Sequence, residues 1–244
     1  MSKIKSPTKH EKRLTVLVSI FVILQIVYLM LMFSVAYSFF AYVAVITTCL
    51  FCILLSDGSR AYCWMQIGLI ATVCADFFLV FLPFQLRVPG VLCFCVTQTA
   101  YFLRVYSEDE NRLRKRIHLI LRVAVSVFSL AAAMFILGIR ADTLSLISVF
   151  YYANLALNLL FSYLQFKKLR VLAIAFSLFI LSDTLIGFDC LSSYLLIPRG
   201  SVVYFITRIG GRFVMPLYLA AQTLIPISLL QRKKKALQKE EANG

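Results

Sequence analysis

The chain alternates long apolar runs with short polar segments. Each run approaches the roughly 20 residues that a helix needs to cross a hydrocarbon core about 30 Å thick. Because the runs lack the alternation of barrel strands, and because lipid offers no partner for backbone groups, each run predicts a helix. Eight helices are expected, approximately over Leu14–Phe33, Val35–Leu55, Tyr62–Leu82, Val88–Tyr106, Ile117–Ile139, Thr143–Leu164, Val171–Phe188 and Gly210–Leu230.

Turn-forming and charged residues separate these runs. The breaks fall at Ser56–Ser59, Pro83, Pro89-Gly90, Ser107–Arg116 and Pro198–Gly200. The least regular stretch runs from Asp189 to Ile209, where apolar residues alternate with turn-forming ones. This stretch predicts either an outer re-entrant or interfacial segment, or extensions of the seventh and eighth helices. The first run is about 20 residues long and has no small-residue cleavage pattern after it, so it is interpreted as a retained span.

Composition supports a membrane protein. Hydrophobic residues make up 61% of the 244 residues, charged residues only 15%, and the mean hydropathy is +0.87. A soluble domain has an apolar fraction nearer half. The predicted fold class is therefore an all-α polytopic membrane protein, an eight-helix transmembrane bundle over residues 14–230. Basic tails are predicted at residues 1–13 and 231–244.

The formal net charge of +14 is concentrated at the ends of the predicted spans. If the N-terminus is cytoplasmic, the inner segments hold 18 basic residues and the outer segments five. This distribution predicts an even number of spans with both termini cytoplasmic. It also favours contact with anionic membrane lipids and argues against nucleic acid, because no basic face carries interleaved aromatic residues.

Two carboxyl groups, those of Asp76 and Asp183, fall inside apolar spans. A charged residue at the centre of a span costs at least about 2.5–3.5 kcal/mol on insertion scales, and such residues usually face a cavity or a functional pathway. Asp76 follows Arg60 by 16 residues and Asp183 follows Arg170 by 13. At a rise of about 1.5 Å per residue, both aspartates are expected at a similar depth, nearer the outer face.

A purely structural role is the alternative for the two aspartates. In that interpretation each carboxylate fixes helix packing through hydrogen bonds or through an ion pair, for which Arg208 and Arg212 are the plausible partners. In the functional interpretation, the carboxyl groups carry general acid–base chemistry.

Further polar residues lie at compatible depths, each pair three or four residues apart on one helix face. They are Gln98 with Tyr101, Asn154 with Asn158, and Tyr218 with Gln222. Polar side chains also hold helices together in lipid, so each pair alone has a structural explanation. No metal site or cofactor is predicted, since the two histidines have no ligand cluster near them in the sequence. The cysteines are expected to pack as small apolar residues.

Four motifs in order along the chain resemble the YhhN-like family, which includes the lysoplasmalogenases. They are Gly68-Leu-x5-Ala75-Asp76-x2-Leu79, Gly90-x3-Phe94-x6-Tyr101, Phe176-x5-Ser182-Asp183 and Tyr218-x2-Ala221-Gln222-x-Leu224-Ile225. The resemblance implies an eight-helix enzyme that hydrolyses the vinyl ether bond of a lysophospholipid to a fatty aldehyde and a glycerophospho-ethanolamine or -choline.

The resemblance carries a functional role to Asp76, Asp183, Tyr101, Tyr218 and Gln222. Two positions depart from the family pattern: Gln98 stands where the family has histidine, and Ala75 where it has glycine. Gln98 does not exchange protons as histidine does, so the family histidine only binds substrate or this chain has lost activity.

The chemistry of the reaction fits a pair of carboxyl groups. One aspartate would protonate the enol-ether carbon, and the other would stabilise the resulting cation and activate water, as in glycoside hydrolysis. The substrate-binding residues expected around Asp76 and Asp183 are Gln98, Tyr101, Asn154, Asn158, Arg208, Arg212, Tyr218 and Gln222, with Arg208 or Arg212 on the phosphate.

Two rival functions stay open at this point. The carboxylates could relay protons in a transporter, or the chain could be a non-catalytic relative that binds lysolipids. Short loops favour a bacterial inner membrane, or the endoplasmic reticulum membrane in a eukaryote.

Overall fold

The computed structural model describes residues 9–34, 37–56, 58–83, 86–191, 194, 198 and 200–243. In this part of the chain, eight helices are long and apolar enough to span a membrane, and there is no strand. The predicted fold class is confirmed. The helices are α1 (Lys9–Ser34), α2 (Tyr37–Leu54), α3 (Arg60–Val80), α4 (Arg87–Glu108), α5 (Arg112–Leu137), α6 (Thr143–Leu164), α7 (Phe166–Leu191) and α8 (Val202–Asn243). A short 3-10 helix, η2 (Gly138–Arg140), follows α5.

Side-chain caps set two of the helix starts. Helix α5 begins five residues before its predicted start, because the side chain of Asn111 accepts hydrogen bonds from the backbone N–H groups of Leu113 and Arg114. Helix α6 begins where predicted. There the Asp142 side chain accepts a hydrogen bond of 2.7 Å from the backbone N–H of Ser145. The Ser145 hydroxyl oxygen in turn accepts one from the backbone N–H of Asp142, which completes a capping box.

The irregular stretch after Asp189 lies largely between two long helices. Helix α7 extends to Leu191 and α8 begins at Val202, so the structure favours helical extensions at both ends. Helix α8 then continues through Pro216 and Pro226 to Asn243, without a break at residue 230. Neither proline can donate a backbone N–H, so each removes one hydrogen bond from the middle of this helix.

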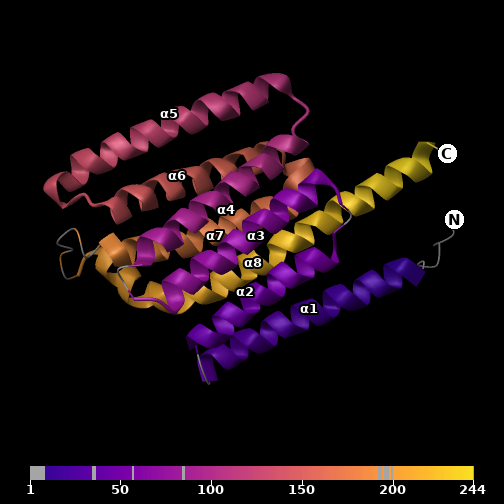
Figure 1. Cartoon of the computed structure of the whole chain (residues 1–244), viewed down its shortest axis with the longest axis horizontal. Helices are drawn as coiled ribbons and strands as arrows, with labels where there is room; N and C mark the ends of the chain where they lie inside the picture. Colours follow the sequence, from indigo (N-terminus) through magenta and orange to yellow (C-terminus); the bar gives the residue numbers. More distant parts are fainter. Residues whose placement is uncertain are drawn as a thin grey trace.

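Contacts between neighbours join six of the helices into a ring. Each packs on the next in the order α2, α3, α4, α6, α7, α8, and α8 packs back on α2. Helices α1 and α5 lie at opposite edges of the bundle (Figure 1), α1 against α2 and α8, and α5 against α6. In the most apolar 18 residues of each helix, only 17% of the residues of α1 and 11% of those of α5 are buried. The share is 33 to 56% in the other six helices. Helices α1 and α5 therefore present most of their apolar surface to lipid.

Small residues bring neighbouring helices of the ring together. A Cβ atom added to Gly68 of α3 would lie 2.5 Å from the Tyr101 ring of α4, and one added to Gly90 would lie 2.8 Å from Leu79. Close approach of backbones at small residues is typical of helix packing in membranes. The glycines of the sequence motifs thus have a packing role, which sets the distance between α3 and α4.

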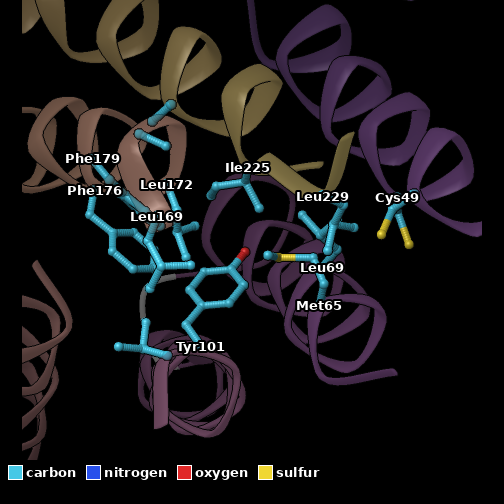
Figure 2. Close-up of a cluster of buried hydrophobic side chains, with 14 of the residues drawn as sticks. Cys49, Met65, Leu69, Tyr101, Leu169, Leu172, Phe176, Phe179, Ile225 and Leu229 are labelled. Carbon is cyan, nitrogen blue, oxygen red and sulfur yellow. The ribbon is translucent and has the colours of Figure 1, made fainter. Parts of the chain in front are cut away.

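The centre of the ring is filled by large apolar side chains (Figure 2). Tyr101 projects from α4 among Met65 and Leu69 of α3, Phe176 of α7 and Ile225 of α8. All five residues are fully buried. This cluster ties four helices to one another and fixes the frame on which the polar residues are held.

Candidate active site in the helix ring

Asp76 lies on α3, four residues before the helix ends, and its side chain is only 8% exposed. Its Oδ2 atom accepts a hydrogen bond of 2.7 Å from the Tyr218 hydroxyl of α8. A phenol donating to a carboxylate forms a charge-assisted hydrogen bond, which is stronger than one between neutral groups. Tyr218 therefore compensates part of the cost of burying Asp76. The two residues are 142 positions apart in the sequence.

Asp183 lies on α7 and is part-buried. Its Oδ2 atom accepts a hydrogen bond from the Tyr151 hydroxyl of α6. Asp76 and Asp183 thus have the same local arrangement, each with one carboxyl oxygen bound by a tyrosine of a neighbouring helix. In both groups, no hydrogen bond to Oδ1 is found within the described residues.

The two tyrosine–aspartate pairs belong to one cluster. A chain of aromatic rings joins the pairs: Phe179 lies 5.5 Å from Tyr218 and 6.3 Å from Phe94, and Phe94 lies 5.5 Å from Tyr151, measured between ring centroids. Four helices that are separate in sequence thus contribute to one acidic site enclosed by aromatic rings.

Gln222 occupies α8 one turn beyond Tyr218. Its side chain is fully buried, and neither its amide nitrogen nor its amide oxygen has a hydrogen-bond partner among the described residues. A buried polar group without a partner costs about 1–3 kcal/mol. Gln222 is therefore a residue whose amide is available to a ligand or to water.

Gln98, Asn154 and Asn158 form a second polar cluster together with Arg122 of α5. The Arg122 guanidinium donates to the side-chain oxygens of Asn154 at 2.7 Å and Asn158 at 2.5 Å. The amide nitrogen of Asn158 in turn donates to the side-chain oxygen of Gln98 at 2.9 Å. Gln98 thus acts as a hydrogen-bond acceptor between α4 and α6, which gives the residue at the family's histidine position a defined structural partner.

Arg208 and Arg212 are both exposed on α8, and neither is paired with an aspartate of the cluster. The structure therefore gives the aspartates tyrosine partners in place of the arginine partners of the structural interpretation. A role for Arg208 or Arg212 on the phosphate stays a prediction.

A surface pocket of about 790 Å³ lies at the opposite end of the ring, where α4 meets α5 and α6 meets α7. Its charges pair with each other, Arg114 with Asp109 at 2.9 Å and Lys168 with Glu110 at 2.5 Å. Because these pairs are satisfied locally and lie far along α7 from Asp183, the pocket is not part of the aspartate site.

Two partners of the predicted residues were missed from the sequence. Tyr151 and Arg122 each lie inside an apolar run, and Tyr151 precedes Asn154 by three residues on the same helix face. This three-residue spacing could have placed Tyr151 among the candidate site residues. Arg122 lies near the inner end of its predicted span, and only the packing of α5 on α6 directs it to the two asparagines.

The fold and the site define a multi-pass integral membrane protein with two tyrosine-bound carboxyl groups inside its helix bundle. The sequence model of the YhhN family matches residues 41–229, and the chain belongs to this family. The matched region begins in α2 and ends in α8, so it contains every helix of the ring. No curated protein and no solved structure matches the chain.

Proposed function

We propose that this protein is a membrane hydrolase that cleaves the vinyl ether bond of lysoplasmalogens. The observation that carries the proposal is the pair of aspartates, each held through Oδ2 by a tyrosine and each without a hydrogen bond to Oδ1 within the described residues. Membership of the YhhN family is consistent with this activity. The membrane is proposed to be a bacterial inner membrane, or the endoplasmic reticulum membrane in a eukaryote.

The reaction uses two carboxyl groups in different protonation states. In the proposal, the protonated one of Asp76 and Asp183 transfers its proton to the alkenyl carbon that is not bonded to oxygen. The cation that results is shared between the ether oxygen and its neighbouring carbon, and the second carboxylate stabilises it. Such a division requires different surroundings for the two carboxyl groups, so that one keeps its proton and the other is charged.

Water then completes the hydrolysis. The carboxylate accepts a proton from the water molecule as its oxygen bonds to the cationic carbon, which gives a hemiacetal. The hemiacetal then breaks at its bond to the glycerol oxygen. The second carboxyl group gives its proton to that oxygen, and the first carboxylate takes the proton of the hemiacetal hydroxyl, which restores both aspartates and releases a fatty aldehyde and a glycerophospho-ethanolamine or -choline. Tyr151 and Tyr218 orient the carboxyl groups throughout, since each fixes one oxygen and directs the other towards the substrate.

The test is aldehyde formation by the purified full-length protein supplied with 1-alkenyl lysophospholipids. Mass spectrometry of a reaction run in D₂O should find one deuterium on the carbon next to the aldehyde, because that carbon receives the catalytic proton. The 1-alkyl analogue, which has no double bond to protonate, should remain intact.

Matched variants identify the residues. Asp76→Asn and Asp183→Asn should each reduce turnover by about 100-fold or more, as loss of a general acid or base does. Asp189→Asn, the same change on an exposed residue of α7, serves as the control and should retain turnover. Full turnover in both site variants would refute the assignment. Binding without turnover would indicate a non-catalytic relative, and lipid flux into vesicles a carrier.

A further inference from the structure

Arg122 carries a positive charge that is not paired with a carboxylate of the described residues. It lies ten residues into α5, inside a membrane-spanning segment, and is part-buried. Its only partners in the described part of the chain are the neutral oxygens of Asn154 and Asn158 and the Phe102 ring, 4.0 Å away. Intramembrane charges normally pair with one another. Asp183 is bound one turn away along α6, by Tyr151, and the fold nevertheless pairs it with this tyrosine and not with Arg122.

The asparagines hold the guanidinium without neutralising it. Asn158 donates its amide nitrogen to the backbone and side-chain oxygens of Gln98, both at 2.9 Å, so its own oxygen faces Arg122. Asn154 likewise donates to the Phe150 carbonyl at 2.8 Å. Arg122 uses two of its five N–H groups in this way, and its Nε is buried without a partner among the described residues. Three donors and a full positive charge remain for a ligand.

His118 adds a second donor to the same place. It precedes Arg122 by one turn of α5, is 1% exposed, and touches the same Phe102 ring at 4.8 Å. Stacking on Phe161 at 3.6 Å fixes the plane of its ring. Its Nε2 atom is buried and has no hydrogen-bond partner in the described residues. A neutral imidazole can carry its proton on either nitrogen, so Nε2 is able to donate to an anion.

We propose that Arg122 and His118 bind the phosphate of the lysophospholipid substrate, an inference that rests on the proposed function. A guanidinium is the side chain best suited to phosphate oxygens, because its N–H groups lie in a planar fork. Among its neighbours in the bundle, α5 packs mainly on α6, the helix that carries the two asparagines.

The spacing along α6 fits a single lysolipid. Tyr151, which holds Asp183, is followed by Asn154 and Asn158, which hold Arg122 at about 4.5 and 10 Å further along the helix axis. In the substrate the ether oxygen and the phosphate are separated only by the glycerol backbone, a distance of this order. The phosphate then lies towards the end of the bundle where α5 begins, and the alkenyl chain extends in the opposite direction.

This direction matches the predicted topology. If the start of α5 is cytoplasmic, the head group of the bound lipid points towards the cytoplasm, and its alkenyl chain points towards the outer face, near which the aspartates are expected.

The test measures binding of a 1-alkyl lysophosphoethanolamine, which is not cleaved, and of the corresponding 1-alkylglycerol, which lacks phosphate. The full-length protein should bind the phosphate-bearing lipid more tightly by about tenfold or more. Arg122→Gln should abolish this preference, and Arg122→Lys should retain part of it. Arg116→Gln, the same change on an exposed residue of α5, is the matched control and should keep the preference.

Several results overturn the proposal. Equal affinity of the unaltered protein for the two lipids would overturn it. This measurement needs no variant, so it decides the matter even if Arg122→Gln fails to fold. A preserved preference in a folded Arg122→Gln protein also overturns it. Glycerol 3-phosphate should compete only weakly, and strong competition would show a site for soluble phosphate. If aldehyde never forms but the preference depends on Arg122, the proposed reaction fails and the phosphate site stands.

Discussion

Helix α6 takes part in two polar clusters of opposite charge. The acidic cluster pairs Asp76 with Tyr218 and Asp183 with Tyr151. The cationic cluster surrounds Arg122 with the amide oxygens of Asn154 and Asn158. In each cluster the charged group is bound by neutral partners.

This separation argues against a purely structural role for the charges. An arginine–aspartate pair would satisfy both groups at once, and each charge would then compensate the desolvation of the other. Neutral partners supply hydrogen bonds but leave the charge itself uncompensated. Under the proposed function, the two carboxyl groups and the guanidinium are left to act on the substrate.

The largest expected effect concerns the tyrosines that define the acidic cluster. Tyr151→Phe and Tyr218→Phe each remove one hydrogen bond to a carboxyl group, worth about 1.5–3 kcal/mol. Each should lower kcat by about 10- to 100-fold while leaving the lysolipid affinity nearly unchanged. Tyr152→Phe is a control on the neighbouring position of α6, since its hydroxyl bonds to Thr184 and not to an aspartate. A fall in affinity with kcat retained would contradict an orienting role.

A second variant removes the difference between the two clusters by giving Arg122 a carboxylate partner. Asn158→Asp places an acidic group where an oxygen already lies 2.5 Å from the Arg122 guanidinium. The new ion pair should reduce the preference for phosphate-bearing lipid by about tenfold, because Arg122 is then neutralised internally. Asn158→Ser changes the amide without adding charge and should have the smaller effect. Comparable loss in both variants would mean that shape, and not charge, decides binding.

A packing prediction tests the frame that holds the acidic cluster. Gly68→Ala would place a Cβ atom 2.5 Å from the Tyr101 ring, and overpacking of this kind costs about 1–3 kcal/mol. Thermal unfolding should show a lower Tm. In Gly211→Ala the new Cβ meets no described atom within 4 Å, so its Tm should be equal or slightly higher. Equal Tm values for the two variants would show that α3 and α4 separate at little cost.

Gln222 should show a trade between stability and activity. Replacing a buried polar group that has no partner by an apolar one of similar size is nearly neutral or stabilising. Gln222→Leu should therefore unfold at the same or a higher temperature than the parent, yet turn over substrate several times more slowly. A clear loss of stability would mean that the amide has a structural partner, and unchanged turnover would remove Gln222 from the site.

The smallest expected effect lies outside the membrane-spanning segments, at the start of α6. The backbone N–H of Ser145 holds the pKa of Asp142 below its ordinary value. The stabilisation is therefore present above the unfolded-state pKa, about 4, and is lost as the pH falls through the lower folded-state pKa. Asp142→Ala should cost at most about 1 kcal/mol at pH 7, and Asp142→Asn, which also caps helices well, less. A loss that persists unchanged in acid would rule out the carboxylate as its source.

The sequence by itself determined the eight helices and marked the two aspartates as candidates for the chemistry. Lipid has no hydrogen-bond partners for a backbone, so apolar runs of sufficient length become helices whatever their neighbours are. The same argument marked Asp76 and Asp183, since a carboxyl group in an apolar run is costly wherever it lies. Helix ends were less determined. The start of α5 depends on a local cap at Asn111, and α8 begins eight residues before its predicted start.

The tertiary structure decided which polar groups meet. Tyr218 reaches Asp76 only because α8 packs back across the ring, and nothing in the 142 intervening residues specifies that contact. Arg122 could have extended to the membrane interface, but the packing of α5 on α6 directs it to two asparagines. Pairing depends on which helix faces which, and that choice comes from the packing of small and large side chains such as Gly68 and Tyr101, over distances that local sequence patterns do not encode.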